Sequence, residues 1–484
     1  MPERFGNLID GACHPPESGE WFADRNPAEL DEIVAEFPVS GPSEAAQAAR
    51  AAAEAQREWA ALPAPARGEV LRRAAELLEA RKDDVAADLT REEGKSLAES
   101  AGETARAVTI LRYYAMQTML PEGDVIPSSS AGTLLYTRRA PLGVCALITP
   151  WNFPIAIPAW KAAPALAFGN AVVLKPASAA PLTAWRLAEC LQDAGMPKGV
   201  LNVLYGSAPV AEALCRAPEV AAISFTGSAR VGRHIAAIAA HDGRKVQLEM
   251  GGVNAVVVLP DADLEQAVRL TVQGAFRSAG QKCTATSRAI VDHSIAPAFE
   301  QRLAEVTRSL KVGPGTDPGA YLGPLIDREA RDAALAAVER AVSEGARLLC
   351  GGHLTGEPYE RGAYMAPVVL ADVRPDMQIA REEVFAPVLS ILRADGLTEA
   401  IELANGVAYG LSASVFTRDL NAALTFADRV EAGMVRVNGE TAGVEPQAPF
   451  GGMKASSSYS REQGLAAREF YTQTRTVAIE RWGA

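Results

Sequence analysis

The hydrophobic and polar residues follow two different patterns along the chain. Ala-rich and Leu-rich runs with helical spacing predict helices over residues 43–62, 67–100 and 101–120, the last ending before Pro121. From residue 142, short apolar runs such as LGVCALITP, AVVLKPAS and AAISFTG alternate with helical stretches. Short buried strands separated by helices predict parallel sheets covered on both faces, which is the α/β fold class.

The alternation of strands and helices resumes after residue 250. NAVVVL predicts a strand, DADLEQAVRLTVQGAFRSAG a helix and SRAIVD another strand. We therefore expect two α/β domains and minor elements between and after them. The predicted boundaries place residues 1–119 and 140–251 in the first domain, 252–451 in the second, and 120–139 and 468–484 in the minor elements.

The composition excludes several classes of protein. The 484 residues are 48% hydrophobic and 22% charged, as in an ordinary globular chain, and the net charge of −12 argues against nucleic-acid binding. The N-terminus, MPERFGNLID, lacks the apolar core of a signal peptide. The uncharged stretch Leu142–Trp160 contains three prolines, which favour a buried strand and turn over a membrane helix. We expect a cytoplasmic protein without membrane or nucleic-acid partners.

Cys283, in GQKCTATSR, is a candidate nucleophile because small and polar residues surround it. The alternative is a buried, inert cysteine, which is the commoner state of this residue type. The six cysteines lie far apart without CxxC spacing, and only five histidines are present. Neither a metal site nor a disulfide framework is therefore predicted.

Two polar residues stand in loops suited to catalysis. Glu249, in QLEMGG, ends a β-like run before two glycines that would let a ligand approach, as suits a general base. Asn152, in TPWNFP, would present its amide rigidly to a developing oxyanion, together with a backbone N–H. The alternatives are a glutamate on the rim of the protein and an asparagine that stabilises its own turn.

A phosphate site is predicted where FTGSARVG follows an apolar run and opens a helix. Gly227 allows a tight turn, Ser228 can cap the helix whose N-terminus would face a pyrophosphate, and Gly232 allows close packing on the sheet. No GxGxxG motif occurs. Because many strand-to-helix turns contain Gly-Ser, this motif is weak by itself.

Taken in order, TPWNFP, KPAS, FTGS, LEMGG, GQKCTATSR, EEVFAPV and PFGG resemble the NAD(P)-dependent aldehyde dehydrogenase superfamily, from about residue 20 to 478. The resemblance implies an aldehyde dehydrogenase-like fold, with a Rossmann-type cofactor domain and an α/β catalytic domain. It also implies a homodimer or homotetramer, in which the minor elements 120–139 and 468–484 mediate oligomerisation.

The resemblance implies oxidation of an aldehyde to a carboxylic acid. Cys283 would attack as a thiolate, the Asn152 amide would bind the oxyanion, and Glu249 would activate the water that hydrolyses the thioester. Lys161 and Glu462 match positions that assist proton movement in relatives. Coenzyme A-acylating relatives usually lack the glutamate, so Glu249 favours water as the acceptor. A coenzyme A-dependent enzyme and a catalytically silent dinucleotide-binding protein remain as alternatives.

The resemblance also implies contacts to the cofactor. The matching residues are Ile148 and Trp151 in the dinucleotide groove, Lys175 and Ser178 at the adenosine ribose, Gly227 and Ser228 at the pyrophosphate, and Glu383 and Phe385 at the nicotinamide ribose. NAD-selective relatives often carry a glutamate at the position of Ser178, which repels a 2′-phosphate. We therefore expect NADP to be accepted alongside NAD, and we leave a preference for NADP open.

ITPWNFPIAIPAWKAAPALAFGN and TAGVEPQAPFGG are similar to members that act on α-ketoglutaric semialdehyde (2,5-dioxopentanoate). Those members usually carry an aromatic residue six positions before the cysteine, where this chain has Arg277. The departure suggests that Arg277 clamps the acidic group of a semialdehyde, between apolar walls from Phe153 and Phe450. The alternatives are an outward arginine at a helix end and another small aliphatic or aromatic aldehyde.

Overall fold

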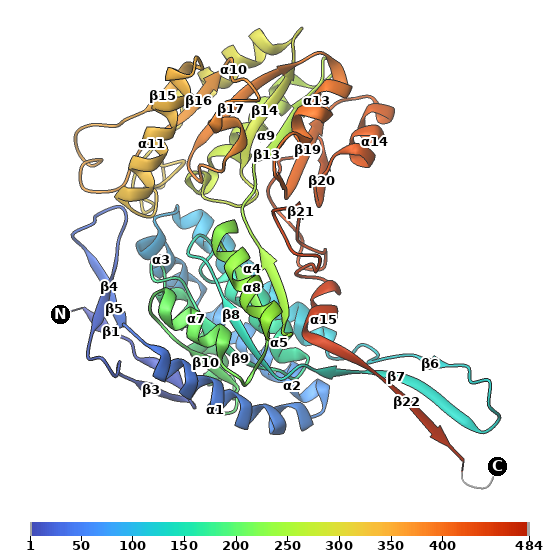
Figure 1. Ribbon diagram of the computed structural model, residues 1–484. Coiled ribbons are helices and arrows are strands. Elements are labelled where there is room, and N and C mark those ends of the chain that lie inside the picture. Colours follow the sequence, from blue (N-terminus) through green and yellow to red (C-terminus); the bar gives the residue numbers. More distant parts are fainter. Residues whose placement is uncertain (1, 482–484) are drawn as a thin grey trace.

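Two seven-stranded sheets, one above the other in Figure 1, form the framework of the protein. The computed structural model describes residues 2–481. Residue 1 and residues 482–484, which belong to the predicted segments 1–119 and 468–484, lie outside the described residues. The chain passes from the first sheet to the second between Glu249 and Asn254. The exact domain boundaries given from the sequence stay a prediction.

The first sheet is parallel over five neighbouring strands and ends in an antiparallel hairpin, as its pairing shows. Its strands, in spatial order, are β12 (Lys245–Glu249), β11 (Val220–Thr226), β8 (Val144–Ile148), β9 (Ala171–Lys175), β10 (Leu201–Val203), β2 (Asn7–Ile9) and β3 (Ala12–His14). β8 and β9 are buried along their whole length, as expected for strands covered on both faces.

Helices cover both faces of this sheet, as the sequence predicts. One face packs against α2 (Ala64–Ala80), α4 (Leu97–Gln117), α5 (Ala156–Ala167) and α6 (Leu182–Asp193). The other packs against α1 (Pro42–Ala61), α7 (Ala208–Arg216) and α8 (Ala229–His241). Leu142–Trp160 forms a strand, a turn and the start of α5, and no helix of residues 2–481 is long and apolar enough to cross a membrane.

The predicted helix over 67–100 is wrong, because the chain breaks twice within it. α2 ends at Ala80, and α3 (Lys82–Glu93) ends at Gly94, which has the left-handed φ of 91° that favours glycine. α4 begins at Leu97 rather than 101, behind a capping box in which Ser96 and Glu99 satisfy each other's backbone N–H groups. The first predicted helix also starts earlier than residue 43, with Gly41 as its cap.

The second sheet repeats the parallel pattern and has one antiparallel strand at its edge. Its strands, in spatial order, are β15 (Arg347–Gly352), β16 (Ala366–Ala371), β17 (Val388–Ala394), β14 (Thr286–Asp292), β13 (Asn254–Val258), β19 (Ser412–Phe416) and β20 (Met434–Val437). Its helices are α9 (Leu264–Phe276), α10 (Ala296–Arg308), α11 (Arg328–Ser343), α12 (Gln378–Arg381), α13 (Gly396–Asn405) and α14 (Leu420–Arg429).

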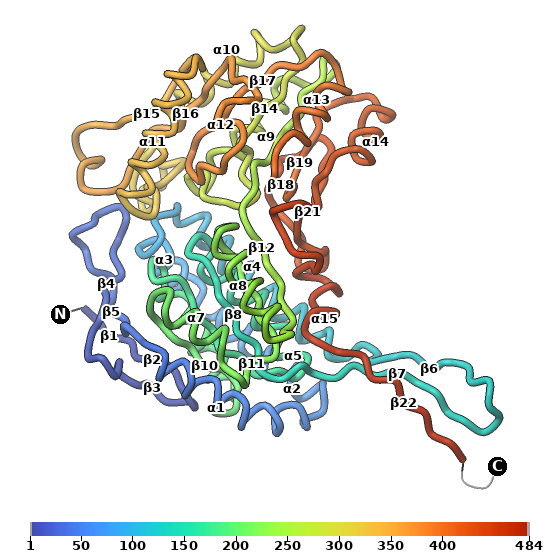
Figure 2. The backbone as a smooth tube through the Cα atoms, viewed as in Figure 1, coloured from blue at the N-terminus to red at the C-terminus, as the bar shows by residue number. Residues whose placement is uncertain are grey.

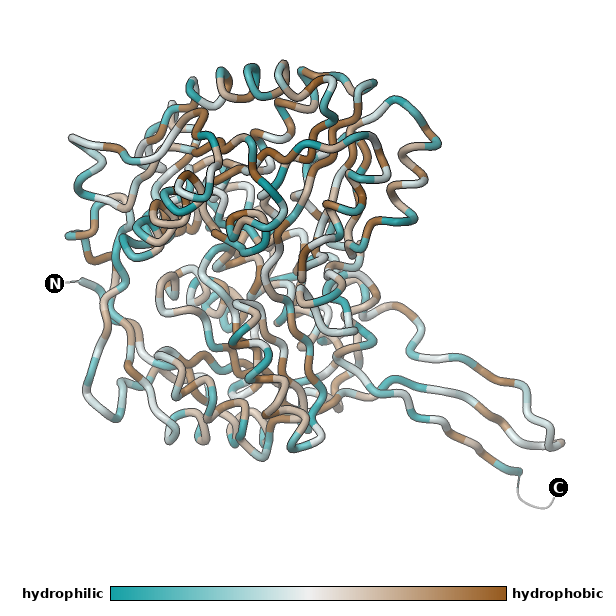
Figure 3. The backbone as a smooth tube through the Cα atoms, turned by 45° about the horizontal axis from the view of Figure 1, so that its top comes forward, coloured by the Kyte–Doolittle hydropathy of each residue, from teal (hydrophilic) through white to brown (hydrophobic). Residues whose placement is uncertain are grey.

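The remaining elements are small. β1 (Glu3–Arg4), β5 (Ile33–Pro38) and β4 (Trp21–Arg25) form one sheet, and β18 (Tyr409–Gly410) pairs with β21 (Met453–Lys454). After α15 (Ala466–Tyr471), β22 (Thr472–Glu480) joins β7 (Thr133–Pro141) and β6 (Val125–Ile126). These last three strands project from the body as an arm (Figure 2), and Figure 3 shows hydrophobic stretches along its backbone. Several of these hydrophobic residues are exposed.

Candidate active site

The loop that carries Cys283 lies between α9 and β14 and is fixed from several sides. A short 3₁₀ segment, η1 (Arg277–Gly280), follows α9. At Gly280 a Cβ atom would lie 2.3 Å from the Ala386 carbonyl oxygen, so only glycine fits. The Asn254 side chain donates to the carbonyl oxygens of Cys283 and Ala285, both at 2.8 Å. Cys283 itself is partly exposed, so a ligand can reach a thiol on a rigid backbone.

Asn152 meets this loop from the first sheet. It lies in the turn between β8 and α5, is buried, and donates from its side-chain nitrogen to the Gln281 carbonyl oxygen at 2.8 Å. An amide nitrogen carries two hydrogens, so this bond leaves one donor for a substrate oxygen. The structure therefore brings Asn152 and the Cys283 loop together, although 129 positions separate Asn152 from Gln281.

Glu249 ends β12 and is only 2% exposed. Its Oε2 accepts from the Ser457 hydroxyl, while Oε1 is buried without a hydrogen-bond partner among residues 2–481. Burial, reinforced by the charge of Glu462, raises the pKa of Glu249 well above its usual value. A buried carboxylate oxygen without a donor is costly, and a water molecule or a reacting proton would satisfy it.

Lys161 and Glu462 form a fully buried ion pair, and Lys161 also donates to the Ser224 hydroxyl at 2.8 Å. The two charges act on Glu249 in opposite directions, since Glu462 raises its pKa and Lys161 lowers it. The pair therefore acts on the candidate base through its charges, and no hydrogen bond within residues 2–481 joins it to Glu249.

The electrostatics around Cys283 disfavour the thiolate in the free protein. Burial, reinforced by the charges of Glu383, Glu249 and Glu462, raises the pKa of the thiol to about 12. The thiol therefore needs a base or a positive charge delivered with a ligand before it can act as a nucleophile.

The predicted phosphate turn has the local structure that its sequence indicates. Ser228 caps α8 by accepting from the Val231 N–H at 3.5 Å. A Cβ at Gly232 would lie 2.5 Å from the Met250 sulfur, so the helix packs closely on the sheet. The free N–H groups at the start of α8 fit a pyrophosphate.

Other predicted cofactor residues come from loops at the ends of strands in both sheets. Trp151, which follows β8 and Ile148, meets Phe385 edge to face at 5.5 Å. Glu383 accepts from the Gly252 N–H at 3.0 Å, and burial raises its pKa to about 7. These aromatic and acceptor groups, which come from both halves of the molecule, fit a dinucleotide between them.

Lys175 and Ser178 lie at the end of β9 and after it. Lys175 is buried, and burial lowers its pKa to about 8. The Ser178 hydroxyl donates to the Gly206 carbonyl oxygen at 3.0 Å. Neither side chain is acidic, so the site presents no carboxylate at the predicted 2′-position.

The predicted substrate residues occupy different surroundings. Phe450 is buried against Trp160, with ring centroids 5.5 Å apart, and the Phe153 ring lies 4.4 Å from the Lys95 ammonium. Arg277 is exposed at the end of α9, beside the Gln273 amide, in an open cleft of about 740 Å³ that Tyr321 also lines. The hydrogen bonds and ring contacts within residues 2–481 do not link Arg277 to either phenylalanine.

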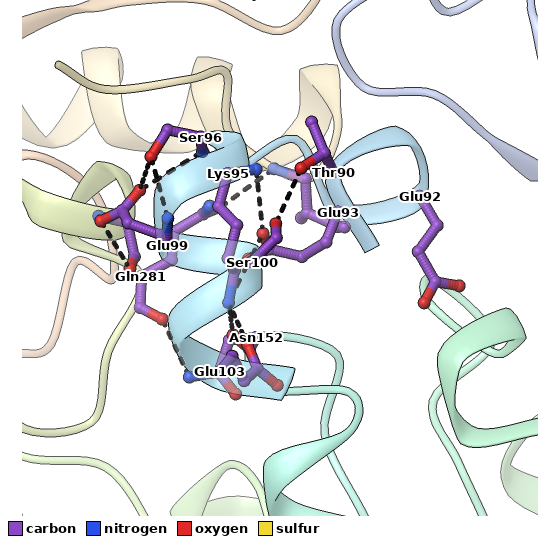
Figure 4. A network of polar contacts seen from close by, with 12 residues as sticks. Thr90, Glu92, Glu93, Lys95, Ser96, Glu99, Ser100, Glu103, Asn152 and Gln281 are labelled. Atoms are coloured by element: carbon purple, nitrogen blue, oxygen red, sulfur yellow. Dashed lines mark hydrogen bonds and ion pairs between the residues drawn. The ribbon is translucent and has the colours of Figure 1, made fainter. Parts of the chain in front are cut away.

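Sequence reasoning missed a buried charged cluster that touches both catalytic loops (Figure 4). Lys95 donates to the Asn152 carbonyl oxygen, and Glu99 accepts from the Ser278 N–H. The signals were the Gly94 stop and the S-x-x-E capping box, which the predicted helix over 67–100 ran through. Within residues 2–481, no group of three or more His, Cys, Asp or Glu side chains is placed to hold a metal ion.

The amino-acid sequence of the chain is similar to those of known proteins over nearly its whole length. The model of the aldehyde dehydrogenase family matches residues 14–477. The α-ketoglutaric semialdehyde dehydrogenase of Bacillus subtilis is 45% identical over 476 residues, covering 98% of each chain. The α-ketoglutarate semialdehyde dehydrogenase of Haloferax volcanii is 44% identical over 480 residues, covering 99% of each chain.

Solved structures have the same fold over 99% of this chain. An NADP-dependent enzyme of E. coli superposes with a TM-score of 0.95 at 36% identity, covering 99% of this chain and 98% of that one. Betaine aldehyde dehydrogenase of Staphylococcus aureus, in complex with NAD⁺, superposes with a TM-score of 0.96 at 32% identity, covering 99% and 95%. Both comparisons confirm the predicted fold class.

Proposed function

The chain belongs to the aldehyde dehydrogenase family, and from that premise we propose that it oxidises an acidic semialdehyde, with α-ketoglutaric semialdehyde as the candidate, to the corresponding acid. The family makes it an NAD(P)-dependent oxidoreductase. The observation that carries the proposed mechanism is the hydrogen bond from Asn152 to the loop of Cys283, beside a buried Glu249 with one unsatisfied oxygen.

In the first step, the Cys283 sulfur would attack the aldehyde carbon and form a C–S bond, while the carbonyl electron pair moves onto oxygen. The resulting oxyanion would accept hydrogen bonds from the free N–H of the Asn152 amide and from the Cys283 backbone N–H. The thiol proton would pass to Glu249, whose raised pKa makes it a stronger base than an exposed glutamate.

NAD or NADP, when bound, supplies the acceptor for the hydride that leaves the substrate carbon. That cofactor would be held by the start of α8 at Gly227 and Ser228 and by the side chains of Trp151, Phe385 and Glu383. The substrate would then remain on Cys283 as a thioester. Glu249 would first pass the thiol proton to solvent and so regain its charge. It would then take a proton from water through its unsatisfied Oε1 while the water oxygen attacks the thioester carbon. The C–S bond would break with its electron pair on sulfur, which takes the proton back from Glu249 as the acid leaves.

The acidic end of the substrate is assigned to Arg277. This arginine is exposed and lines an open cleft, and its two terminal nitrogens lie beside the Gln273 amide, which a carboxylate would displace as the acceptor of the paired donors. The names of the two semialdehyde dehydrogenase relatives support the same substrate class.

The test compares an acidic semialdehyde with a neutral aldehyde of similar length. Arg277→Ala should raise KM for the acidic substrate about tenfold or more, a loss of about 1.4 kcal/mol, and leave KM for the neutral one within about twofold. Lys311→Ala, which removes an exposed cation paired with Asp317, serves as the matched control. Equal effects of Arg277→Ala on the two substrates would exclude the clamp. Formation of a coenzyme A thioester instead of the free acid would show that coenzyme A, and not water, accepts the acyl group.

The projecting arm supports a homodimer or homotetramer. β22 pairs with β7 on one side only, and β20 is the last strand of the second sheet. Val125, Ile126, Leu134 and Ile479 are exposed on the arm. Open strand edges and exposed apolar side chains favour pairing with another copy, and light scattering of the purified protein would give the number of copies.

A further inference from the structure

A cluster of charged side chains is buried where α3 ends and α4 begins, in contact with the turn that carries Asn152 (Figure 4). The cluster forms because the sequence ends one helix and begins the next within a few residues. Gly94 ends α3 in a left-handed conformation, and the Ser96–Glu99 capping box starts α4. Lys95 lies between the two helices, and its backbone N–H donates to the Glu93 carboxylate at 3.1 Å.

The Lys95 ammonium contacts three different groups. It donates to Glu103 Oε2 at 2.6 Å and to the Asn152 carbonyl oxygen at 2.8 Å, and it lies 4.4 Å from the centre of the Phe153 ring. Its side chain is 1% exposed. Burial opposes the charged form, but Glu103 and Glu93 outweigh burial and raise the pKa of Lys95. A charge this deeply buried needs every partner, and one of those partners is the backbone of Asn152.

Glu103 holds the other end of the same turn. Its Oε1 accepts from the backbone N–H groups of Ile155 and Ala156, at 3.2 and 3.1 Å, where α5 begins. The ion pair of Lys95 and Glu103 therefore binds the backbone of this turn at Asn152, through Lys95, and at Ile155 and Ala156, through Glu103. One helical turn earlier, Glu99 accepts from the Ser278 N–H at 2.7 Å, in the loop before Cys283.

We propose that Lys95, through its ion pair with Glu103, is a positioning residue that holds the Asn152 amide where the oxyanion forms. The inference rests on the proposed function, because it assigns a role to the residue that supports Asn152. An oxyanion donor works only when it is held in place before the reaction, since its energy is then not used to reorganise the site. Lys95 touches neither the thiol nor the substrate and acts through the Asn152 main chain.

Glu92, three positions before Lys95, provides a matched control. It is also fully buried, and it accepts from the Leu182 N–H at 2.7 Å, the Thr183 N–H at 2.9 Å and the Thr183 hydroxyl. Those donors belong to the start of α6, and Figure 4 shows Glu92 turned away from the Lys95 cluster. Glu92 therefore stabilises the same part of the fold without contacting the Asn152 turn.

The experiment is a double-mutant cycle between Lys95→Met and Asn152→Ala in the full-length enzyme, with kcat and KM measured well below the melting temperature. We expect Lys95→Met to lower kcat about 10–100-fold with KM within about threefold, because loss of an oxyanion donor costs about 10²–10³-fold. In the Asn152→Ala background, Lys95→Met should lower kcat by less than about twofold further. Glu92→Gln should lower the melting temperature and leave kcat unchanged.

Equal losses from Lys95→Met in the two backgrounds would overturn the proposal, as would an unchanged kcat in Lys95→Met. If Lys95→Met does not fold, Glu103→Gln takes its place in the cycle with the same expected and contradicting results. Full activity of Asn152→Ala alone would be a different failure, because it would remove the proposed oxyanion role of Asn152 whatever Lys95 does.

Discussion

The Lys95 cluster and the Glu249 site are both buried and charged, yet they differ in how their charges are satisfied. Lys95 has two close hydrogen bonds and a second carboxylate at 3.7 Å, and Glu103 accepts from two backbone N–H groups. Glu249 has one hydroxyl donor and a buried oxygen without a partner among residues 2–481. Glu93 also has a buried oxygen without a partner among residues 2–481, but it lies beside Lys95, whereas the charge of Glu249 acts on the Cys283 thiol. The first arrangement fixes a backbone, and the second places a proton acceptor near the thiol.

Cys145 and Cys283 differ in their exposure and in their charged neighbours, although the pKa of the thiol is similar in both. Cys145 is buried in β8, where burial raises the pKa of its thiol to about 12. Cys283 has a similar pKa, but it is partly exposed and stands near three carboxylates. Reactivity here therefore depends on access and on a neighbouring base, because the pKa of the free thiol alone does not distinguish the two residues.

The largest expected effect comes from removing the nucleophile. Cys283→Ala should reduce NAD(P)H formation by about 10⁴-fold or more, because no other group can form the thiohemiacetal. Absorbance at the nicotinamide band measures the rate. Cys350→Ala, which removes a cysteine of similar exposure in β15, should retain wild-type activity. Substantial activity in Cys283→Ala would show that another residue carries the chemistry.

Removing the base should have the next largest effect. Glu249→Gln keeps the shape and the Ser457 contact but cannot accept a proton, so steady-state turnover should fall about 10²–10⁴-fold. A rapid burst of up to one NAD(P)H per active site should persist at alkaline pH, because hydroxide from the solvent can then take the thiol proton in place of Glu249. Stopped-flow absorbance separates the burst from turnover. A variant that turns over at the wild-type rate would exclude Glu249 as the base.

The raised pKa of Cys283 predicts a pH dependence in the free enzyme. Because the reactive form is the thiolate, alkylation by iodoacetamide should accelerate about tenfold per pH unit and keep rising past pH 10, towards a pKa of about 12. An ordinary exposed cysteine levels off above a pKa of about 8.5. Mass spectrometry of the peptide that contains Cys283 gives the site-specific rate. A plateau near neutral pH would show that a cation stabilises the thiolate.

The smallest effect concerns cofactor choice. Ser178→Glu places a carboxylate after β9, where it would repel a 2′-phosphate, so kcat/KM for NADP should fall about 10–100-fold while that for NAD stays within about threefold. Ser178→Gln, which has the same length without the charge, is the control. An equal loss for both cofactors would place residue 178 away from the 2′-position.

The parallel sheets were predictable from the sequence because their pattern is local, and the catalytic roles of Cys283, Asn152 and Glu249 stay predictions that also rest on local motifs. Buried strands such as β8 are continuous apolar runs, and Cys283, Asn152 and Glu249 stand in short motifs. The strand order and the unsatisfied Glu249 oxygen were not predictable, because Ser457, which holds the other oxygen, lies 208 positions away in the chain. The position of Lys95 between two helices depends on the break at Gly94, and the predicted helix over 67–100 runs through that break.

The most direct test of the mechanism is to trap the covalent intermediate. Glu249→Gln would be mixed with the semialdehyde and NAD(P), quenched in acid, digested with trypsin and examined by mass spectrometry. If Cys283 is the nucleophile, the acyl group appears as a thioester on the peptide Cys283–Arg288, in an amount equal to the burst of NAD(P)H. A burst of NAD(P)H with no acyl group on Cys283, or with the acyl group on another residue, would contradict it.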